Sequence, residues 1–120
     1  MRKLLILAFT ALTLVFTNGC SKADAGIDFT NQEAVIIDVR TVDEFNSGHL
    51  SRAERVDWQL IQSAAIDMNL DKDEPILLYC RSGNRAGKAK SLLEKMGFTN
   101  VHNLGGVANA SNATKDQIVR

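Results

Sequence analysis

Two short, mostly apolar runs, residues 34–39 and 76–79, constrain the fold of this chain more than any other feature. Both are rich in Ile, Leu or Val, and the first is interrupted only by Asp38. Near-continuous apolar runs of this length are typical of strands buried on both faces, as in a parallel sheet covered by helices. Residues 53–56 and 101–104 are weaker strand candidates.

Three segments between these runs are predicted to be helical: residues 42–46, about 58–66 and about 85–96. In the longest of them the apolar residues fall on one face and the lysines stay largely off it. Gly97 is well placed to follow the end of that helix. Strands that alternate with helices predict an α/β fold with a mostly parallel central sheet and helices on both of its faces.

The chain is long enough for one domain only, because it has 120 residues. We expect this domain to span residues 27–107. Residues 108–120 form a tail of small and polar residues, and the sequence assigns no structure to it.

The first nineteen residues are expected to be a signal peptide rather than part of the domain. Arg2 and Lys3 precede an apolar run at residues 4–16 that is broken only by two threonines. At a rise of about 1.5 Å per residue, a helix of this length is much shorter than the ~30 Å hydrocarbon core of a membrane. The pattern therefore predicts export, with the bacterial periplasm as the expected location.

Two cleavage positions remain open. Thr17-Asn18-Gly19-Cys20 is similar to a bacterial lipoprotein box, which predicts cleavage before Cys20 and acylation of its thiol. Ala23-Asp24-Ala25 is an alternative site, with cleavage after residue 25. In either case Cys80 is left as the free thiol of an exported protein.

Charge and cysteine content exclude several functions. Fourteen basic and fourteen acidic residues cancel, so bulk positive charge cannot drive binding to nucleic acid. Two cysteines are too few for a disulfide scaffold or for a zinc site with four thiolates.

The segment that carries the chemistry is Tyr79-Cys80-Arg81-Ser82-Gly83-Asn84-Arg85. It places Cys80 at the carboxyl end of a strand, where ligand sites of α/β sheets lie, and opposite the start of a helix. Backbone amides of the loop and of the first helical turn can form an anion-binding cradle there. Gly83 permits the positive φ that such a loop needs, and Arg81 and Arg85 add positive charge. These features predict a lowered thiol pKa for Cys80.

Two other interpretations of this segment compete with that one. Cys80 could simply be a small apolar residue at the end of a core strand. The loop could also belong to a cysteine phosphatase, which uses a C-x-x-x-x-x-R motif. Only four residues separate Cys80 from Arg85, so the loop is one residue too short for that motif.

The motif Cys80-x-x-Gly83-x-Arg85 resembles the active-site loop of rhodanese-type sulfurtransferases. The similarity extends over about residues 28–107 and is greatest to small periplasmic rhodaneses of the phage-shock-protein E type. The other segments that carry it are Ile37-Asp38-Val39-Arg40, Glu44-Phe45, Gly48-His49-Leu50, Leu92, Gly97-Phe98 and Leu104-Gly105-Gly106.

This resemblance implies that Cys80 takes a sulfur atom from thiosulfate as a persulfide and passes it to cyanide or to a thiol. It implies further that the active-site loop binds the substrate, with Arg85 and Arg81 attracting the anionic donor. The substrate-binding residues are then Arg81, Ser82, Gly83, Asn84 and Arg85. No metal or organic cofactor is required, and we expect a monomer that touches a membrane only through a lipid on Cys20.

Two further functions stay open beside the enzyme. A persulfide carrier would load Cys80 and deliver the sulfur to a protein partner without turnover. An inactive rhodanese-like binding module is disfavoured by the intact cysteine and its loop.

Several polar residues invite a catalytic interpretation that we do not adopt. Asp38, Arg40 and Glu44 are expected to form an ion-pair network that ties a strand to the following turn. His49 and His102 have no partner at a metal-ligand spacing and are expected to be structural.

Three more residues bear on the pocket. Trp58 is expected in the core or in a pocket wall. Arg52 and Arg55 stand where many rhodaneses have glycine and asparagine, so the turn that contains them should differ from the family's.

Overall fold

The computed structural model describes residues 27–120. The predicted signal peptide, the lipidation site at Cys20 and both cleavage positions lie outside these residues. Within the described part, no helix is both long enough and apolar enough to cross a membrane.

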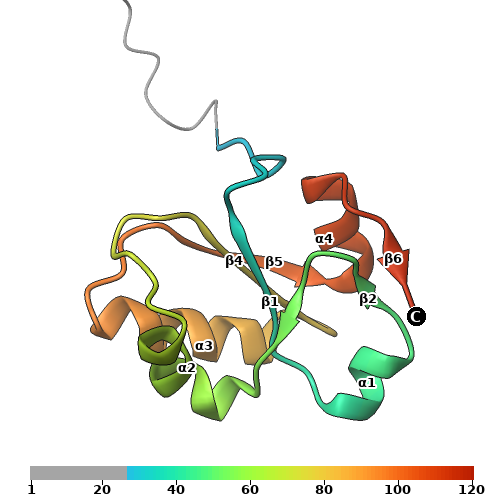
Figure 1. Cartoon of the computed structure of the whole chain (residues 1–120). Coiled ribbons are helices and arrows are strands. Elements are labelled where there is room, and N and C mark those ends of the chain that lie inside the picture. Colours follow the sequence, from blue (N-terminus) through green and yellow to red (C-terminus); the bar gives the residue numbers. More distant parts are fainter. Residues whose placement is uncertain (1–26) are drawn as a thin grey trace, which may run out of the picture.

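A four-stranded parallel sheet in the order β3-β1-β4-β5 forms the centre of the molecule (Figure 1). Ile37 of β1 lies opposite Glu54 of β3 on one side and Leu78 of β4 on the other. The predicted parallel sheet is therefore confirmed. The strand bounds are β1 Val35–Asp38, β3 Glu54–Arg55, β4 Ile76–Cys80 and β5 Val101–Gly106.

Within residues 27–120, five helical segments accompany the sheet, and they cover both of its faces as predicted (Figure 1). The segment predicted as one helix at 58–66 is instead a short 3-10 helix, η2, followed by α2. The bounds are α1 Val42–Asn46, η2 Trp58–Leu60, α2 Ile61–Asp67, α3 Asn84–Lys95 and α4 Val107–Thr114.

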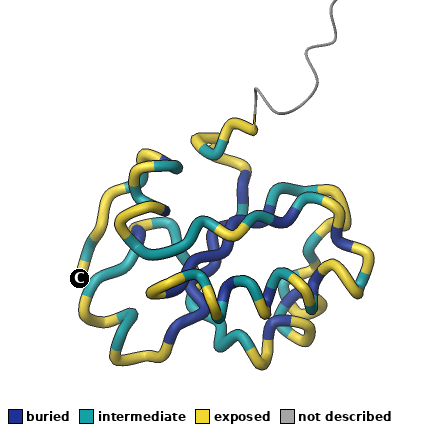
Figure 2. The backbone as a smooth tube through the Cα atoms, turned by 180° about the vertical axis from the view of Figure 1, so that it is seen from behind, coloured by how far each residue is buried: buried dark blue, intermediate teal, exposed yellow. Residues whose placement is uncertain are grey.

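The strand β4 shows how the two faces are divided, because all five of its residues are buried. Ile76, Leu78 and Cys80 belong to the core beneath α2 and α3. Leu77 and Tyr79 belong to the core on the opposite face, which also includes Ala110 of α4. Figure 2 shows this arrangement as a buried centre surrounded by exposed turns.

The segment Arg81–Gly83, which follows Cys80 and is called the cysteine loop below, leads directly into α3. The helix then runs back along the sheet. Its buried residues, Ala86, Ala89 and Leu93, lie on the face that the sequence predicts. Gly97 ends it, since the Gly97 and Phe98 amides donate to carbonyl oxygens of its last turn at 3.0 and 3.2 Å. The cysteine loop is thus held between a buried strand and a firmly packed helix.

The C-terminal segment, to which the sequence assigned no structure, folds onto the domain. Residues 107–114 form α4, whose Ala110 and Thr114 are buried. Strand β6, Ile118–Val119, pairs antiparallel with β2, His49–Leu50. The Asp116 carboxylate between them accepts a hydrogen bond from the Arg52 amide at 2.8 Å.

Candidate active site

Cys80 is the last residue of β4 and lies at the carboxyl end of the parallel sheet, as predicted. It is a free thiol with only 1% of its surface exposed. A β-bulge between Leu78 and Cys80 shifts the register so that Cys80 lies opposite Gly106 of β5. The sulfur is therefore held among backbone segments rather than at a loop tip.

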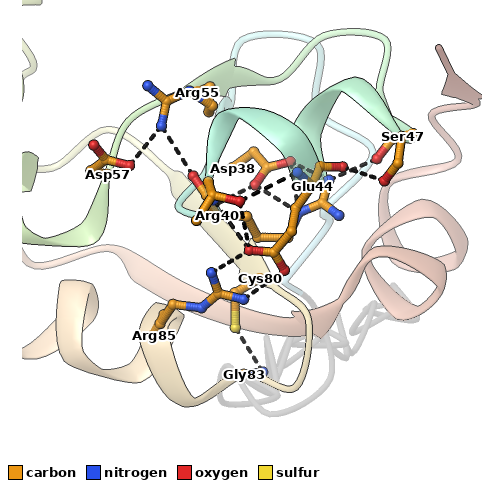
Figure 3. A network of polar contacts seen from close by, with 11 residues as sticks. Asp38, Arg40, Glu44, Ser47, Arg55, Asp57, Cys80, Gly83 and Arg85 are labelled. Carbon is orange, nitrogen blue, oxygen red and sulfur yellow. Dashed lines mark hydrogen bonds and ion pairs between the residues drawn. The ribbon is translucent and has the colours of Figure 1, made fainter.

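Backbone amides of the loop and of the first turn of α3 converge on the Cys80 sulfur. The Gly83 amide donates a hydrogen bond to Sγ at 2.9 Å (Figure 3). Burial raises the pKa of the thiol, but hydrogen bonds from the amides of Ala86, Ser82, Gly83 and Arg85 outweigh it, so the net pKa lies below the ordinary value. The arrangement stabilises a thiolate at the N-terminal end of a helix.

The set of amides around the sulfur differs slightly from the one that the sequence suggested. Ala86, in the first turn of α3, adds an amide outside the predicted loop. The Ala86 amide could have been predicted from a general rule, because the amides in the first turn of any helix have no partner within the helix.

The end of β5 braces the cysteine loop from the other side, in part through Asn103, which the sequence did not single out. Gly83 has φ +91°, and Asn103 Nδ2 donates to the Gly83 carbonyl oxygen at 2.8 Å. Asn103 Oδ1 in turn accepts from the Gly105 amide at 2.9 Å. A Cβ on Gly106 would lie 2.6 Å from the Arg81 carbonyl oxygen, so that contact requires glycine. These contacts hold the Gly83 amide where it faces the sulfur.

Arg85 forms an ion pair with Glu44 in which two guanidinium nitrogens donate to the two carboxylate oxygens at 2.6 and 2.9 Å (Figure 3). The hydrogen bond from Arg85 is the main reason why the pKa of Glu44 is lowered to about 2. Glu44 also accepts hydrogen bonds from the amide and hydroxyl of Thr41, which caps α1. The expected network is therefore wrong in one respect, because the partner of Glu44 lies on α3, 41 residues away.

Asp38 and Arg40 form the other half of the expected network, and their pairing is confirmed. Arg40 Nη2 lies 2.6 Å from Asp38 Oδ2 and also donates to the Gly48 carbonyl oxygen at 2.7 Å. The Asp38 and Arg40 side chains are 0% and 6% exposed. This pair ties the end of β1 to the turn before β2.

A cavity of about 360 Å³ opens beside the loop. Arg85 lines the cavity and connects it to the cysteine loop. Trp58 forms part of the cavity wall, as the sequence suggested. Lys88 lies over the Trp58 ring, with its ammonium nitrogen 5.0 Å from the ring centroid. The lining residues are Val39, Arg40, Thr41, Asp57, Trp58, Gln59, Leu60 and Arg85.

The remaining residues of the predicted site, Arg81, Ser82 and Asn84, are exposed. Of these three, only Ser82 directs its backbone amide at the sulfur. The backbone carbonyl of Arg81 packs against Gly106 of β5. Asn84 begins α3.

The two arginines that depart from the family pattern have structural partners. Arg52 Nη2 donates to the carbonyl oxygens of Gln32 and Ala34 at 2.8 and 3.0 Å, which holds the segment before β1. Arg55 donates to the Arg40 carbonyl oxygen and pairs with Asp57 at 2.7 Å.

Both histidines contact aromatic rings. His49 stacks on Phe45 with ring centroids 3.6 Å apart, and His102 meets Phe29 edge-on at 5.3 Å. Among residues 27–120, no group of three or more His, Cys, Asp or Glu side chains could hold a metal ion.

A thiol surrounded by amides at the carboxyl end of a parallel sheet defines a cysteine-centred α/β domain. The family model described as "Rhodanese-like domain" matches residues 22–113, which is most of the sequence. The chain therefore belongs to the rhodanese-like family of sulfurtransferases.

Curated relatives agree with this assignment. The chain is 31% identical over 71 residues to thiosulfate sulfurtransferase PspE of Escherichia coli (strain K12), covering 59% of this chain and 68% of that protein. It is 35% identical over 75 residues to the uncharacterized protein YqhL of Bacillus subtilis (strain 168), covering 62% of this chain and 58% of that protein.

Among solved structures, the fold matches one described as "rhodanese with anions from E. coli". The TM-score is 0.62 and the sequence identity 27%, and the match covers 72% of this chain and 98% of the other. The predicted α/β fold and the resemblance to single-domain rhodaneses are thus confirmed.

Proposed function

We propose that the protein is a thiosulfate sulfurtransferase that carries the sulfur as a persulfide on Cys80. The observation that carries the proposal is the ring of backbone amides from Ser82, Gly83, Arg85 and Ala86 around a thiol whose pKa they lower. An ionised thiol is the nucleophile that this chemistry needs. The thiosulfate sulfurtransferase activity named for the PspE relative supports the choice of donor.

The reaction proceeds in two displacements. The Cys80 thiolate attacks the outer sulfur of thiosulfate, the S–S bond of the donor breaks, and sulfite leaves with the bonding electrons. The carbon of cyanide then attacks the terminal sulfur of the persulfide, which releases thiocyanate and restores the thiolate. A thiol acceptor would react at the same terminal sulfur.

In both steps negative charge is held at the end of β4. The amides that meet the Cys80 sulfur need no reorganisation, because Gly83 and the first turn of α3 already point inward. Fixed dipoles of this kind stabilise an anion more effectively than mobile water does.

Replacement of the nucleophile tests the proposal most directly. Cys80→Ser should abolish formation of thiocyanate from thiosulfate and cyanide, because a hydroxyl cannot form the persulfide. The melting temperature should stay close to that of the wild type, since serine has nearly the same size. A variant that keeps the wild-type rate would refute the mechanism.

A persulfide carrier is the alternative with the same chemistry at Cys80. Mass spectrometry of the intact protein after thiosulfate treatment should show one added sulfur atom in either case. Addition of cyanide then separates the two, because an enzyme continues to form thiocyanate whereas a carrier stops after one equivalent.

We also propose that the protein is exported and anchored through a diacylated Cys20. The support is the sequence alone: a basic start, an apolar run and a lipoprotein-like box. The intact mass of the protein isolated from membranes would report both the cleavage point and the lipid. A mature chain that starts after residue 25 would instead support a soluble exported form.

A further inference from the structure

The arginines at the cavity that Arg85 lines are already neutralised by carboxylates. Three arginine side chains lie on or beside its wall, and each forms an ion pair; the pairs are Asp38–Arg40, Asp57–Arg55 and Glu44–Arg85. The six formal charges cancel. The attraction for an anionic donor is therefore left to the loop amides, to the exposed Arg81 of the loop and to Lys88, which lies over the Trp58 ring.

Among these pairs, only Glu44–Arg85 joins the cavity to the reactive thiol. Arg85 lines the cavity, and its backbone amide faces the Cys80 sulfur. The pKa of its guanidinium is raised mainly by the hydrogen bond to Glu44 and in part by the charge of that sulfur. Both side chains of the pair are 27% exposed, and Arg85 lines the cavity, so a donor that enters it meets a guanidinium already paired with Glu44.

The pair is also geometrically strong. Arg85 uses two nitrogens on two oxygens, which is the most favourable arrangement for a guanidinium and a carboxylate. Thr41 holds the same carboxylate from the other side through its amide and hydroxyl. A donor that recruits the guanidinium has to displace a partner that is already fixed.

We propose that Glu44 determines donor specificity by occupying Arg85, so that the site disfavours doubly charged sulfur donors relative to singly charged ones. The inference rests on the proposed sulfurtransferase function. Its physical basis is that the interaction of Glu44 with a donor scales with the donor's charge. A dianion loses more than a monoanion of similar size, both by direct repulsion and by the loss of Arg85 as a partner.

Two donors separate charge from chemistry. Thiosulfate is a dianion and releases sulfite, whereas methanethiosulfonate is a monoanion of similar size and releases methanesulfinate. In both cases the Cys80 thiolate attacks the terminal sulfur, the S–S bond breaks, and the leaving group departs with the electron pair. The ratio of the two KM values therefore reports the effect of donor charge.

The test is Glu44→Gln, because glutamine keeps the shape and can still cap α1 together with Thr41. The KM for thiosulfate should fall about threefold to tenfold, and that for methanethiosulfonate by about the square root of that factor. The matched control is Asp43→Asn, which removes the same charge from an exposed neighbour on α1 and should leave both KM values unchanged.

A second variant tests whether the effect passes through Arg85. In an Arg85→Gln background, Glu44→Gln should produce a clearly smaller fall in the KM for thiosulfate, because the freed guanidinium is no longer present. An equal change for both donors, an equal effect of Asp43→Asn, or a rise in the KM for thiosulfate would overturn the inference.

A binding measurement keeps this inference separate from the proposed function. In a Cys80→Ser background no transfer can occur, and calorimetry reports the Kd of thiosulfate alone. That Kd should fall by about the same factor when Glu44→Gln is added. If the wild type transfers no sulfur but this Kd still falls, the function fails and only the effect of Glu44 on anion binding stands. If transfer occurs and the Kd does not fall, only the inference fails.

Discussion

Two carboxylate–arginine pairs place their arginines in the wall of the same cavity, and the pairs differ in burial. Asp38 and Arg40 are 0% and 6% exposed, whereas Glu44 and Arg85 are each 27% exposed. Each pair has a closest approach of 2.6 Å between nitrogen and oxygen. Geometry alone therefore does not distinguish them, and their surroundings do.

The difference separates the pair that maintains the fold from the pair that we propose to act on the donor. The buried pair joins the end of β1 to the Gly48 carbonyl, and neither partner can be hydrated if the other is removed. The exposed pair joins α1 to α3, and water can solvate either partner that is left alone. The first should respond to mutation in stability, and the second in donor binding.

The largest expected effect is that of Asp38→Asn. The substitution leaves the buried Arg40 guanidinium without a counter-charge, so the free energy of unfolding should fall by about 3–5 kcal/mol. Urea denaturation followed by circular dichroism measures it. Asp57→Asn, in the half-exposed pair with Arg55, is the matched control and should cost less than about 1 kcal/mol. Equal losses would remove the distinction between buried and exposed pairs.

A smaller loss is expected for Arg40→Lys, which keeps the charge but removes the planar fork. One ammonium group cannot reproduce the bonds of Arg40 to both Asp38 oxygens and to Gly48, so we expect a loss of about 1–3 kcal/mol in the same assay. Arg55→Lys provides the comparison at an exposed pair. A larger loss at Arg55 than at Arg40 would contradict the ranking by burial.

The smallest effect on stability should come from Glu44→Gln, with a loss below about 1 kcal/mol at neutral pH. Because the pKa of Glu44 is lowered from 4.5 to about 2, the wild type should hold its full advantage above about pH 4.5 and lose it as the pH falls toward 2. Arg85→Gln should remove most of the same pH-dependent part. Melting temperatures measured across this range check both variants, and a difference that is undiminished at pH 2 would be incompatible with the pair.

The sequence predicted the centre of the fold better than its periphery. The run at 76–79 became β4 because it is buried on both faces, so composition alone identified it. The helix α4 was missed because Ala, Asn, Ser and Thr carry no clear apolar period, and its stability comes from burying Ala110 and Thr114. The two-residue strands β2 and β6 depend on each other and pair residues that are 68 and 70 positions apart, which no local pattern reveals.

The same contrast applies to the site. The placement of Cys80 and the inward amides followed from a strand, a short loop and a helix that are adjacent in sequence. The partner of Glu44 could not be found in this way, because α1 and α3 are far apart in the sequence and meet only through the tertiary fold. The role of Asn103 was not predicted for the same reason, since β5 reaches Gly83 only through parallel pairing with β4.

The near-complete burial of Cys80 has a consequence for which partners can react with it. With 1% of its surface exposed, the thiolate itself is within reach of narrow electrophiles only. Once a sulfur atom is added, the reactive end lies one bond farther out, where wider nucleophiles can approach. In the proposed mechanism the depth of Cys80 would restrict the size of the donor more than that of the acceptor. Bulky alkylating reagents should therefore modify the persulfide form of the protein faster than the form with a free thiol.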